Sequence, residues 1–289
     1  MFGSWKLGLS VLAVAVLVGG CSSSGGGDED MADATGALTD LAPDVAIPDS
    51  VWRPKPGTTW QWQLSGVVDT SLDVAMYDID LFEATQEVVN SLHADGRIVI
   101  CYFSAGTHED WRPDQSSFPA EIIGKGLPEW EGEKWLDVRA QSLRPILSAR
   151  LDKAVALGCD GVEPDNVDAF DNDSGFDLTG ADQLAFNRWL ADEAHKRGLS
   201  VGLKNDLGQV LELLPWFDWA LNEECVAYDD CASLRPFIDA GKAVFHTEYV
   251  DDQKTGETAL SQVCSDPQRD GFSTLIKDWD LTAWRMACP

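Results

Sequence analysis

The stretch that decides the fold runs from Thr179 to Lys204 and is TGADQLAFNRWLADEAHKRGLSVGLK. Thr179 and Asp182 have the spacing of a helix-capping box, and apolar residues then recur at helical intervals. Gly198 is placed to end this helix, and an apolar strand over Ser200–Lys204 follows at once. A helix that leads directly into a strand is one half of a repeating β/α unit.

The same alternation of short apolar strands and helical segments extends in both directions along the chain. The predicted strands are Trp60–Leu64, Val74–Ile79, Arg97–Phe103, Gly161–Asp165, Ser200–Lys204, Trp219–Glu223, Ala243–Tyr249 and Phe272–Lys277. The predicted helices are Leu81–Ala94, Arg139–Leu157, Gly180–Arg197, Gly208–Leu214, Ser233–Ala240 and Glu257–Asp266. Alternation of this kind indicates parallel strands joined by right-handed crossovers.

Eight such strands favour a closed barrel, and the sequence contains no G-x-G-x-x-G phosphate loop that would favour an open doubly wound sheet. We therefore predict the α/β class, with residues 51–289 forming a single-domain (β/α)8 TIM barrel. Residues 106–136 are long and rich in Trp and Pro for a connection. They are expected to form an excursion over the barrel mouth.

The N-terminal 50 residues have the composition of export and tether segments. Residues 1–20 combine one positive charge at Lys6 with an apolar run, which is typical of a signal peptide. The small residues before Cys21 resemble a bacterial lipobox, so Cys21 is expected to be lipidated; an ordinary secretion signal with an incidental cysteine is the alternative. Residues 21–50 are predicted to be a disordered acidic tether. The protein is thus expected to be exported and anchored by lipid to the cell membrane or outer membrane.

The chain is strongly acidic, with 49 acidic against 21 basic residues and a formal net charge of −28. A field of this sign repels nucleic acid and attracts cations, so we expect no nucleic-acid partner and no membrane contact beyond the N-terminal lipid. Two explanations for the charge stay open, namely solubility or adaptation to salt, and attraction of a cationic substrate. A monomer is expected.

Seven cysteines less Cys21 leave six, an even number that favours disulfides in an oxidising compartment. Fifteen pairings are possible in principle. Proximity along the chain favours Cys225 with Cys231 and Cys264 with Cys288, which leaves Cys101 with Cys159. A zinc site is the alternative, but the sequence has no C-x2-C or H-x3-H spacing, so neither a metal nor a cofactor is predicted.

Acidic and polar residues gather where the predicted strands end, which is the active-site face of such barrels. Strand alternation places Asp165 at a strand tip on the same side as Glu163, and it allows only one of Glu223 and Glu224 to face the site. Hydrolysis of a glycoside needs two carboxyl groups, and acids from two non-adjacent strands meet that need. The competing interpretation is that these acids serve as helix caps and ion-pair partners. His195, on the predicted helix Gly180–Arg197, is expected at the surface.

Several strings resemble glycoside hydrolase family 114, the endo-α-1,4-polygalactosaminidases. They are WQWQL at 60–64, CYFSAG at 101–106, GVEPDNVD at 161–168, GLKND at 202–206 and NEEC at 222–225. The resemblance runs from about Trp60 to Cys288. It implies a (β/α)8 barrel that cleaves α-1,4-linked galactosamine polymers internally, and so a cationic amino-sugar polysaccharide as partner.

The resemblance places the catalytic carboxylates on Asp165 and Glu223, which we assign as nucleophile and general acid/base. Retention is expected, although retention and inversion differ by a carboxyl separation that a sequence does not contain. The substrate-binding candidates are Trp60, Asp78, Asp80, Tyr102, Ser104, Glu163, Asn166, Asp168, Lys204, Asn205, Glu248 and Tyr249. The alternative function is a non-catalytic cell-surface lipoprotein that binds cationic polysaccharide and needs neither catalytic carboxylate.

Overall fold

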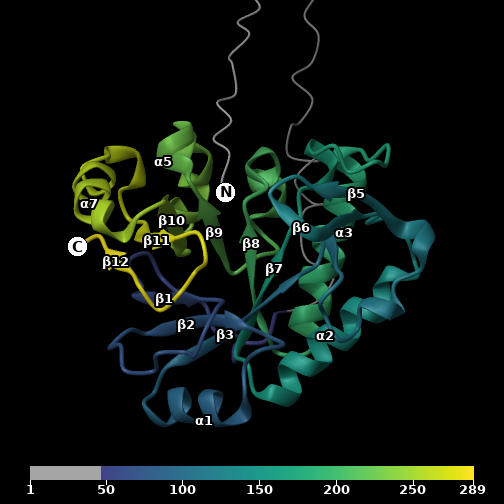
Figure 1. Cartoon of the computed structure of the whole chain (residues 1–289), viewed down its shortest axis with the longest axis horizontal. Helices are drawn as coiled ribbons and strands as arrows, with labels where there is room; N and C mark the ends of the chain where they lie inside the picture. The colour runs from purple at the N-terminus through teal and green to yellow at the C-terminus, as the bar shows by residue number, and fades with distance from the viewer. Residues whose placement is uncertain (1–46) are drawn as a thin grey trace, which may run out of the picture. The chain divides into compact units, whose positions relative to one another are not determined.

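The centre of the fold is a curled parallel sheet, seen in a computed structural model that describes residues 47–289 (Figure 1). Its strands are β1 (Trp60–Gln63), β2 (Met76–Asp80), β3 (Ile98–Ser104), β7 (Gly161–Asp165), β8 (Ser200–Lys204), β9 (Trp219–Glu223), β10 (Val244–Val250) and β11 (Ser273–Asp278). These match the eight predicted strands, with ends that differ by at most two residues. The predicted signal peptide, the lipidated Cys21 and the tether up to residue 46 lie outside the described residues.

The sheet has nine strands in the order β1-β2-β3-β7-β8-β9-β10-β11-β12. The predicted eightfold closure is not confirmed, because no strand pairing joins β1 to β11 within residues 47–289. The short strand β12 (Met286–Ala287) runs antiparallel on the edge of β11 that would otherwise face β1. Single hydrogen bonds outside the strand pairing connect β1 with the C-terminal part of the sheet. Trp60 Nε1 donates to Ser273 O at 2.8 Å, and Leu64 N donates to Leu281 O at 3.0 Å.

Helices lie along the outside of the sheet, in the positions expected of crossover connections (Figure 1). They are α1 (Gln86–Ala94), α2 (Leu143–Leu157), α3 (Gly180–Lys196), α4 (Val210–Leu213), α5 (Cys225–Tyr228), α6 (Arg235–Asp239) and α7 (Gly256–Cys264). The capping box is present, since the Thr179 side chain accepts from Asp182 N and the Asp182 side chain accepts from Thr179 N. Within residues 47–289, no helix has both the length and the apolar character that a membrane span requires.

Residues 106–136 fold into a second, three-stranded antiparallel sheet, which the sequence did not predict. Its order is β4 (Thr107–Glu109), β6 (Trp130–Leu136) and β5 (Ile123–Leu127). The sheet starts directly after β3 at Gly106, where a Cβ would overlap the backbone carbonyl of Asn166. Glycine is needed there because the two strand ends approach so closely.

Two apolar layers hold the sheet. One lies between the strands and the outer helices, and the other fills the inside of the curl with large side chains such as Trp60, Trp219 and Phe245. The aromatic ring centroids of Trp60 and Phe245 are 4.9 Å apart, and those of Trp219 and Phe245 are 5.3 Å apart. This packing closes the interior, so polar groups are left to gather at the C-terminal strand ends.

All three predicted disulfides are confirmed, namely Cys101–Cys159, Cys225–Cys231 and Cys264–Cys288. The prediction of a surface position for His195 is wrong. Its imidazole is fully buried and lies 3.0 Å from Asp218 Oδ2, a carboxylate that also accepts from Val201 N. This contact ties α3 to the start of β9.

Candidate active site

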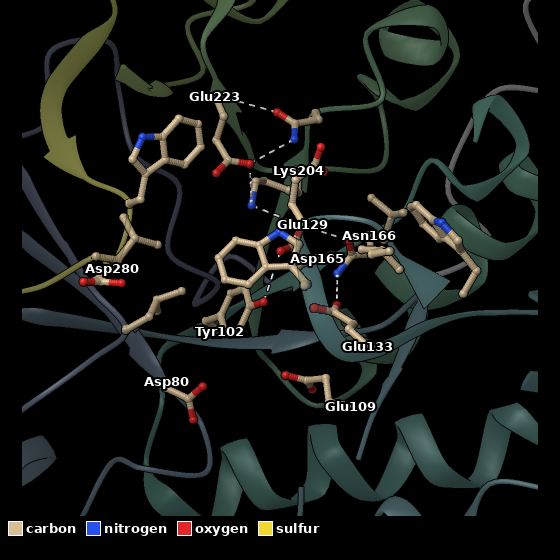
Figure 2. Close-up of a pocket in the computed structure, with 18 of the residues that line it drawn as sticks. Asp80, Tyr102, Glu109, Glu129, Glu133, Asp165, Asn166, Lys204, Glu223 and Asp280 are labelled. Atoms are coloured by element: carbon tan, nitrogen blue, oxygen red, sulfur yellow. Dashed lines mark hydrogen bonds and ion pairs between the residues drawn. The ribbon is translucent and has the colours of Figure 1, made fainter. Parts of the chain in front are cut away.

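A cavity of about 1070 Å³ lies at the C-terminal ends of the parallel strands (Figure 2). Residues from β1, β2, β3, β7, β8, β9 and β10 line it, together with the antiparallel sheet and residues 279–282. Asp165 and Glu223 both face into it, from strands that are separated only by β8. The structure thus brings together the two carboxylates that the sequence singled out.

The ammonium group of Lys204 is the centre of the site. Its Nζ lies 3.1 Å from Glu163 Oε1, 3.1 Å from Asp165 Oδ1 and 3.2 Å from Glu223 Oε2, and it sits 4.9 Å above the Trp62 ring. Burial alone would lower the pKa of Lys204, but the surrounding carboxylates, Asp165 first, raise it well above its usual value. Lys204 therefore remains charged and fixes both cavity carboxylates.

Each of the two cavity carboxylates has further hydrogen-bond donors of its own. Asp165 accepts from the Tyr102 hydroxyl at 3.1 Å and from Asn166 N at 2.7 Å. Glu223 accepts from Asn205 Nδ2 at 3.2 Å and from the Tyr249 hydroxyl. Donors of this kind stabilise carboxylate charge and restrict side-chain rotation.

The backbone turns sharply where the three central strands end. Asn166, Asn205 and Glu224 follow β7, β8 and β9 directly and have φ values of 59°, 49° and 62°. Asparagine tolerates this left-handed region, whereas a glutamate there is uncommon. Glu224 lines the cavity together with Glu223, so the prediction that only one of them faces the site is wrong; the left-handed turn at Glu224 breaks the strand alternation. The turn at Asn205 also lets its side-chain oxygen accept from Glu223 N at 3.0 Å, which orients the end of β9. Backbone strain is therefore concentrated beside the catalytic candidates.

Beneath Lys204 lies a second, fully buried pair of acids, Asp78 and Glu163. Burial raises the pKa of Glu163 to about 7 although Lys204 opposes that change, and burial together with Glu163 raises the pKa of Asp78 well above its usual value. No N–H or O–H group in the described chain donates to either oxygen of Asp78. Both shifts favour a proton on this buried pair, and Glu163 also accepts from Trp62 Nε1 at 3.1 Å.

The antiparallel sheet contributes another acid, Glu133, which accepts from Asn166 Nδ2 at 3.1 Å and from the Thr107 hydroxyl. Burial raises the pKa of Glu133 to about 7. Nearby, Arg112 donates to both oxygens of Asp80 at 2.9 and 2.7 Å and to Glu109 at 2.8 Å. The charge of Asp80 is thus already balanced within the protein.

Seven of the twelve predicted substrate-binding residues line the cavity. They are Asp80, Tyr102, Asn166, Asp168, Lys204, Asn205 and Tyr249. The other five do not line it. Trp60, Asp78, Ser104, Glu163 and Glu248 are each at most 6% exposed. Trp60 packs in the core, and Glu248 is held by His246 at 3.0 Å and by Val226 N at 2.8 Å.

Sequence reasoning missed the cavity residues that lie outside the parallel strands. These are chiefly Trp111, Glu129, Trp130, Glu133, Trp279 and Asp280. Their positions depend on how residues 106–136 and 279–284 fold back over the strand ends. The abundance of tryptophan in the first of these segments was the one available signal.

Within residues 47–289, one group of side chains has metal-ligand spacing, namely Cys225, Cys231 and His246. Both of its sulfur atoms belong to one disulfide. They are not thiolates, so this group lacks the donor character of a metal site.

Two carboxylates held by one cation, at the C-terminal strand ends of a curled parallel sheet, define a glycosidase type of site. The comparisons agree with this class. The chain belongs to glycoside-hydrolase family GH114, which it matches over residues 42–289, and it is a glycoside hydrolase. The resemblance noted in the sequence is confirmed.

Two solved structures and one further protein are similar. The crystal structure of Aspergillus fumigatus Ega3 in complex with galactosamine is 42% identical, with a TM-score of 0.79, over 82% of this chain and 97% of that one. The glycoside hydrolase domain of PelA from Pseudomonas aeruginosa shares the fold, at 14% identity and a TM-score of 0.64, over 80% of this chain and 98% of that one. An uncharacterised protein of Methanocaldococcus jannaschii is 31% identical over 99 residues, which are 32% of this chain and 29% of that protein.

Proposed function

We propose that this protein is an endo-acting hydrolase of α-1,4-linked galactosamine polymers that uses Asp165 and Glu223. The observation that carries the proposal is the Lys204 ammonium, which holds both carboxylates in one large cavity. The similarity to Ega3, whose crystal structure contains galactosamine, supports this sugar as the repeating unit.

Asp165 is the proposed nucleophile, as the family resemblance implies, and Lys204, Tyr102 and Asn166 N all donate to its carboxylate and hold it in place. Glu223 is the proposed general acid/base. Because Asp165 Oδ1 and Glu223 Oε2 lie 3.1 and 3.2 Å from the same Nζ, these two oxygens are at most about 6.3 Å apart, a limit that includes the roughly 5–5.5 Å carboxyl separation of retaining enzymes. The mechanism we infer is retaining: Asp165 attacks the sugar carbon while Glu223 protonates the leaving oxygen.

Two acids that line the cavity have no basic partner within the described residues, and this supports a cationic substrate. No basic side chain pairs with Asp168 or Glu224 in the described part of the chain, and both line the cavity. Burial raises the pKa of Asp168 to about 6 and that of Glu224 to about 7. An ammonium group of the polymer would compensate this cost, so the substrate completes the charge balance of the site.

The remaining features belong to the same proposal. Residues 1–20 are a signal peptide, Cys21 carries the lipid, residues 21–50 are a tether, and residues 51–289 form one catalytic domain. The domain is a (β/α)8 barrel in architecture, whose last position is closed by side-chain and loop contacts. The protein is exported, held at the membrane by its lipid, and monomeric.

The test is release of oligosaccharides from a de-N-acetylated galactosamine polymer by the wild type, Asp165→Asn and Glu223→Gln. The matched control is Glu257→Gln, which removes an exposed carboxylate on α7 away from the cavity. We expect at least a thousandfold loss of rate for both site variants, with retained binding, and no loss for the control. Equal release by all four proteins refutes the proposal. Binding without release by the wild type favours instead the non-catalytic polysaccharide-binding lipoprotein.

A further inference from the structure

Three tryptophans that line the cavity keep much of their surface exposed. Trp111 and Trp130 are each 52% exposed and Trp279 is 46% exposed. Trp279 is distinct because its ring stacks on Tyr249, with centroids 4.2 Å apart and planes 16° apart, while its Nε1 donates to Asp251 at 3.0 Å. One face of the indole is thus occupied by tyrosine, and the opposite face is available to a ligand.

The loop that carries Trp279 is held rigidly. Asp278 accepts from Thr282 N at 2.9 Å, from the Thr282 hydroxyl at 2.6 Å and from Gln253 at 2.7 Å. From beneath, the buried Lys277 ammonium donates to Thr282 O at 2.6 Å and to Trp284 O at 2.7 Å. A side chain fixed before binding loses little conformational entropy when a ligand stacks on it.

Trp279 is also connected to the catalytic pair. Its stacking partner Tyr249 donates its hydroxyl hydrogen bond to Glu223. The three side chains therefore form a continuous row on the side of the cavity that Glu223 occupies. Asp280, the next residue along the chain, lines the same cavity and is exposed (Figure 2).

We propose that Trp279 and Tyr249 form the subsite for the sugar unit on the leaving-group side of the scissile bond. This inference rests on the proposed function, because Glu223 marks that side only as the proton donor to the leaving oxygen. The ligand is a hexosamine ring whose C–H face stacks on the indole, as sugar faces do on aromatic rings. Asp280 offers a carboxylate to the ammonium group of the same unit.

The experiment compares steady-state rates and products on end-labelled α-1,4-galactosamine oligosaccharides of defined length. The proteins are the wild type, Trp279→Ala, Trp279→Phe and Tyr249→Phe, with Tyr228→Ala as control. Tyr228 is 72% exposed and does not line the cavity. Melting temperatures are measured for each protein, so that loss of fold is separated from loss of the subsite.

Trp279→Ala is expected to raise KM about tenfold with kcat within about twofold, and to change the position of the preferred cut. Trp279→Phe keeps a stacking ring and should recover most of the affinity. Tyr249→Phe keeps the stack but loses the Glu223 contact, so it should lower kcat with little change in KM. The inference is overturned if Trp279→Ala keeps the wild-type KM and cutting position, or if it lowers only kcat as Tyr249→Phe does. An inactive wild type overturns the proposed function, and this inference with it.

Discussion

Replacement of Lys204 by methionine tests the charge arrangement on which the site depends. Lys204 is 2% exposed and is the cation that contacts Glu163, Asp165 and Glu223. Methionine has a similar length and no charge. The variant therefore keeps much of the packing around Trp62 and leaves three carboxylates without a counter-ion.

The magnitude follows from the distances. At 3.1 to 3.2 Å and an effective dielectric constant of about 20, each ion pair contributes roughly 5 kcal/mol before desolvation. Experience with buried pairs places the net cost of removing one partner at about 3–5 kcal/mol. For a domain of this size that corresponds to a fall of about 10 °C in melting temperature. The pKa of Glu163, which burial already raises and Lys204 lowers, rises further in the variant.

The assay is thermal unfolding followed by circular dichroism, together with hydrolysis of the galactosamine polymer. We expect Lys204→Met to lose activity by at least a hundredfold, because a nucleophilic carboxylate must be ionised. The double variant Lys204→Met with Glu163→Gln removes one buried charge of each sign and should regain about 2 kcal/mol of stability but no activity. Lys196→Met, on the surface of α3, is the control and should be neutral. A Lys204→Met protein as stable as the wild type would refute the reasoning, as would a double variant no better than the single one.

Two further predictions concern stability. Burial raises the pKa of Asp206 to about 8, so the folded state binds a proton that the unfolded state has lost, and wild-type stability should fall as pH rises from about 4 to 8. Asp206→Asn should remove the share of that fall that Asp206 causes, while the other buried acids keep theirs. In urea unfolding, the variant should gain on the order of 2–4 kcal/mol relative to the wild type between pH 4 and pH 8, and parallel pH dependences would contradict the prediction. Replacing Cys101 and Cys159 by serine opens a loop of 58 residues and should cost about 4 kcal/mol in the same measurement, whereas an unchanged midpoint would show that the disulfide is dispensable.

Much of the fold was predictable because it depends on local signals. The strand at Gly161–Asp165 and the helix that begins after Thr179 follow from residue alternation and from a capping box, both of which act over a few neighbouring residues. The absence of a β1–β11 pairing could not be predicted in this way. It depends on β12, a strand of two residues that pairs with β11 and has no recognisable pattern in its own sequence. The burial of His195 likewise depends on Asp218, which is 23 residues away.

The site residues likewise include some that the sequence could predict and others that it could not. Asp165 and Glu223 were predictable because strand ends of a parallel sheet meet at one face. Whether an acid at such an end touches the cavity or supports it from below was not, because Asp78, Glu163 and Asp165 have equally suggestive sequence positions. Asp165 lies at the strand tip and reaches the cavity, whereas Asp78 and Glu163 lie deeper and are fully buried. Trp279 and Glu133 come from segments that fold over the strand ends, so only the tertiary structure shows their role.

The imbalance of charge at the site links its stability to its substrate. Glu163, Asp165 and Glu223 share the single ammonium of Lys204, and burial raises the pKa of Glu163 and of the neighbouring Asp78, which favours a proton on this buried pair. A neutral sugar would leave the remaining carboxylates uncompensated, whereas a polymer of amino sugars brings its own cations. Buried carboxylates without counter-ions lower the stability of the protein without ligand, but they favour a cationic sugar over a neutral one. Such a loss of stability in return for specificity is common at functional sites.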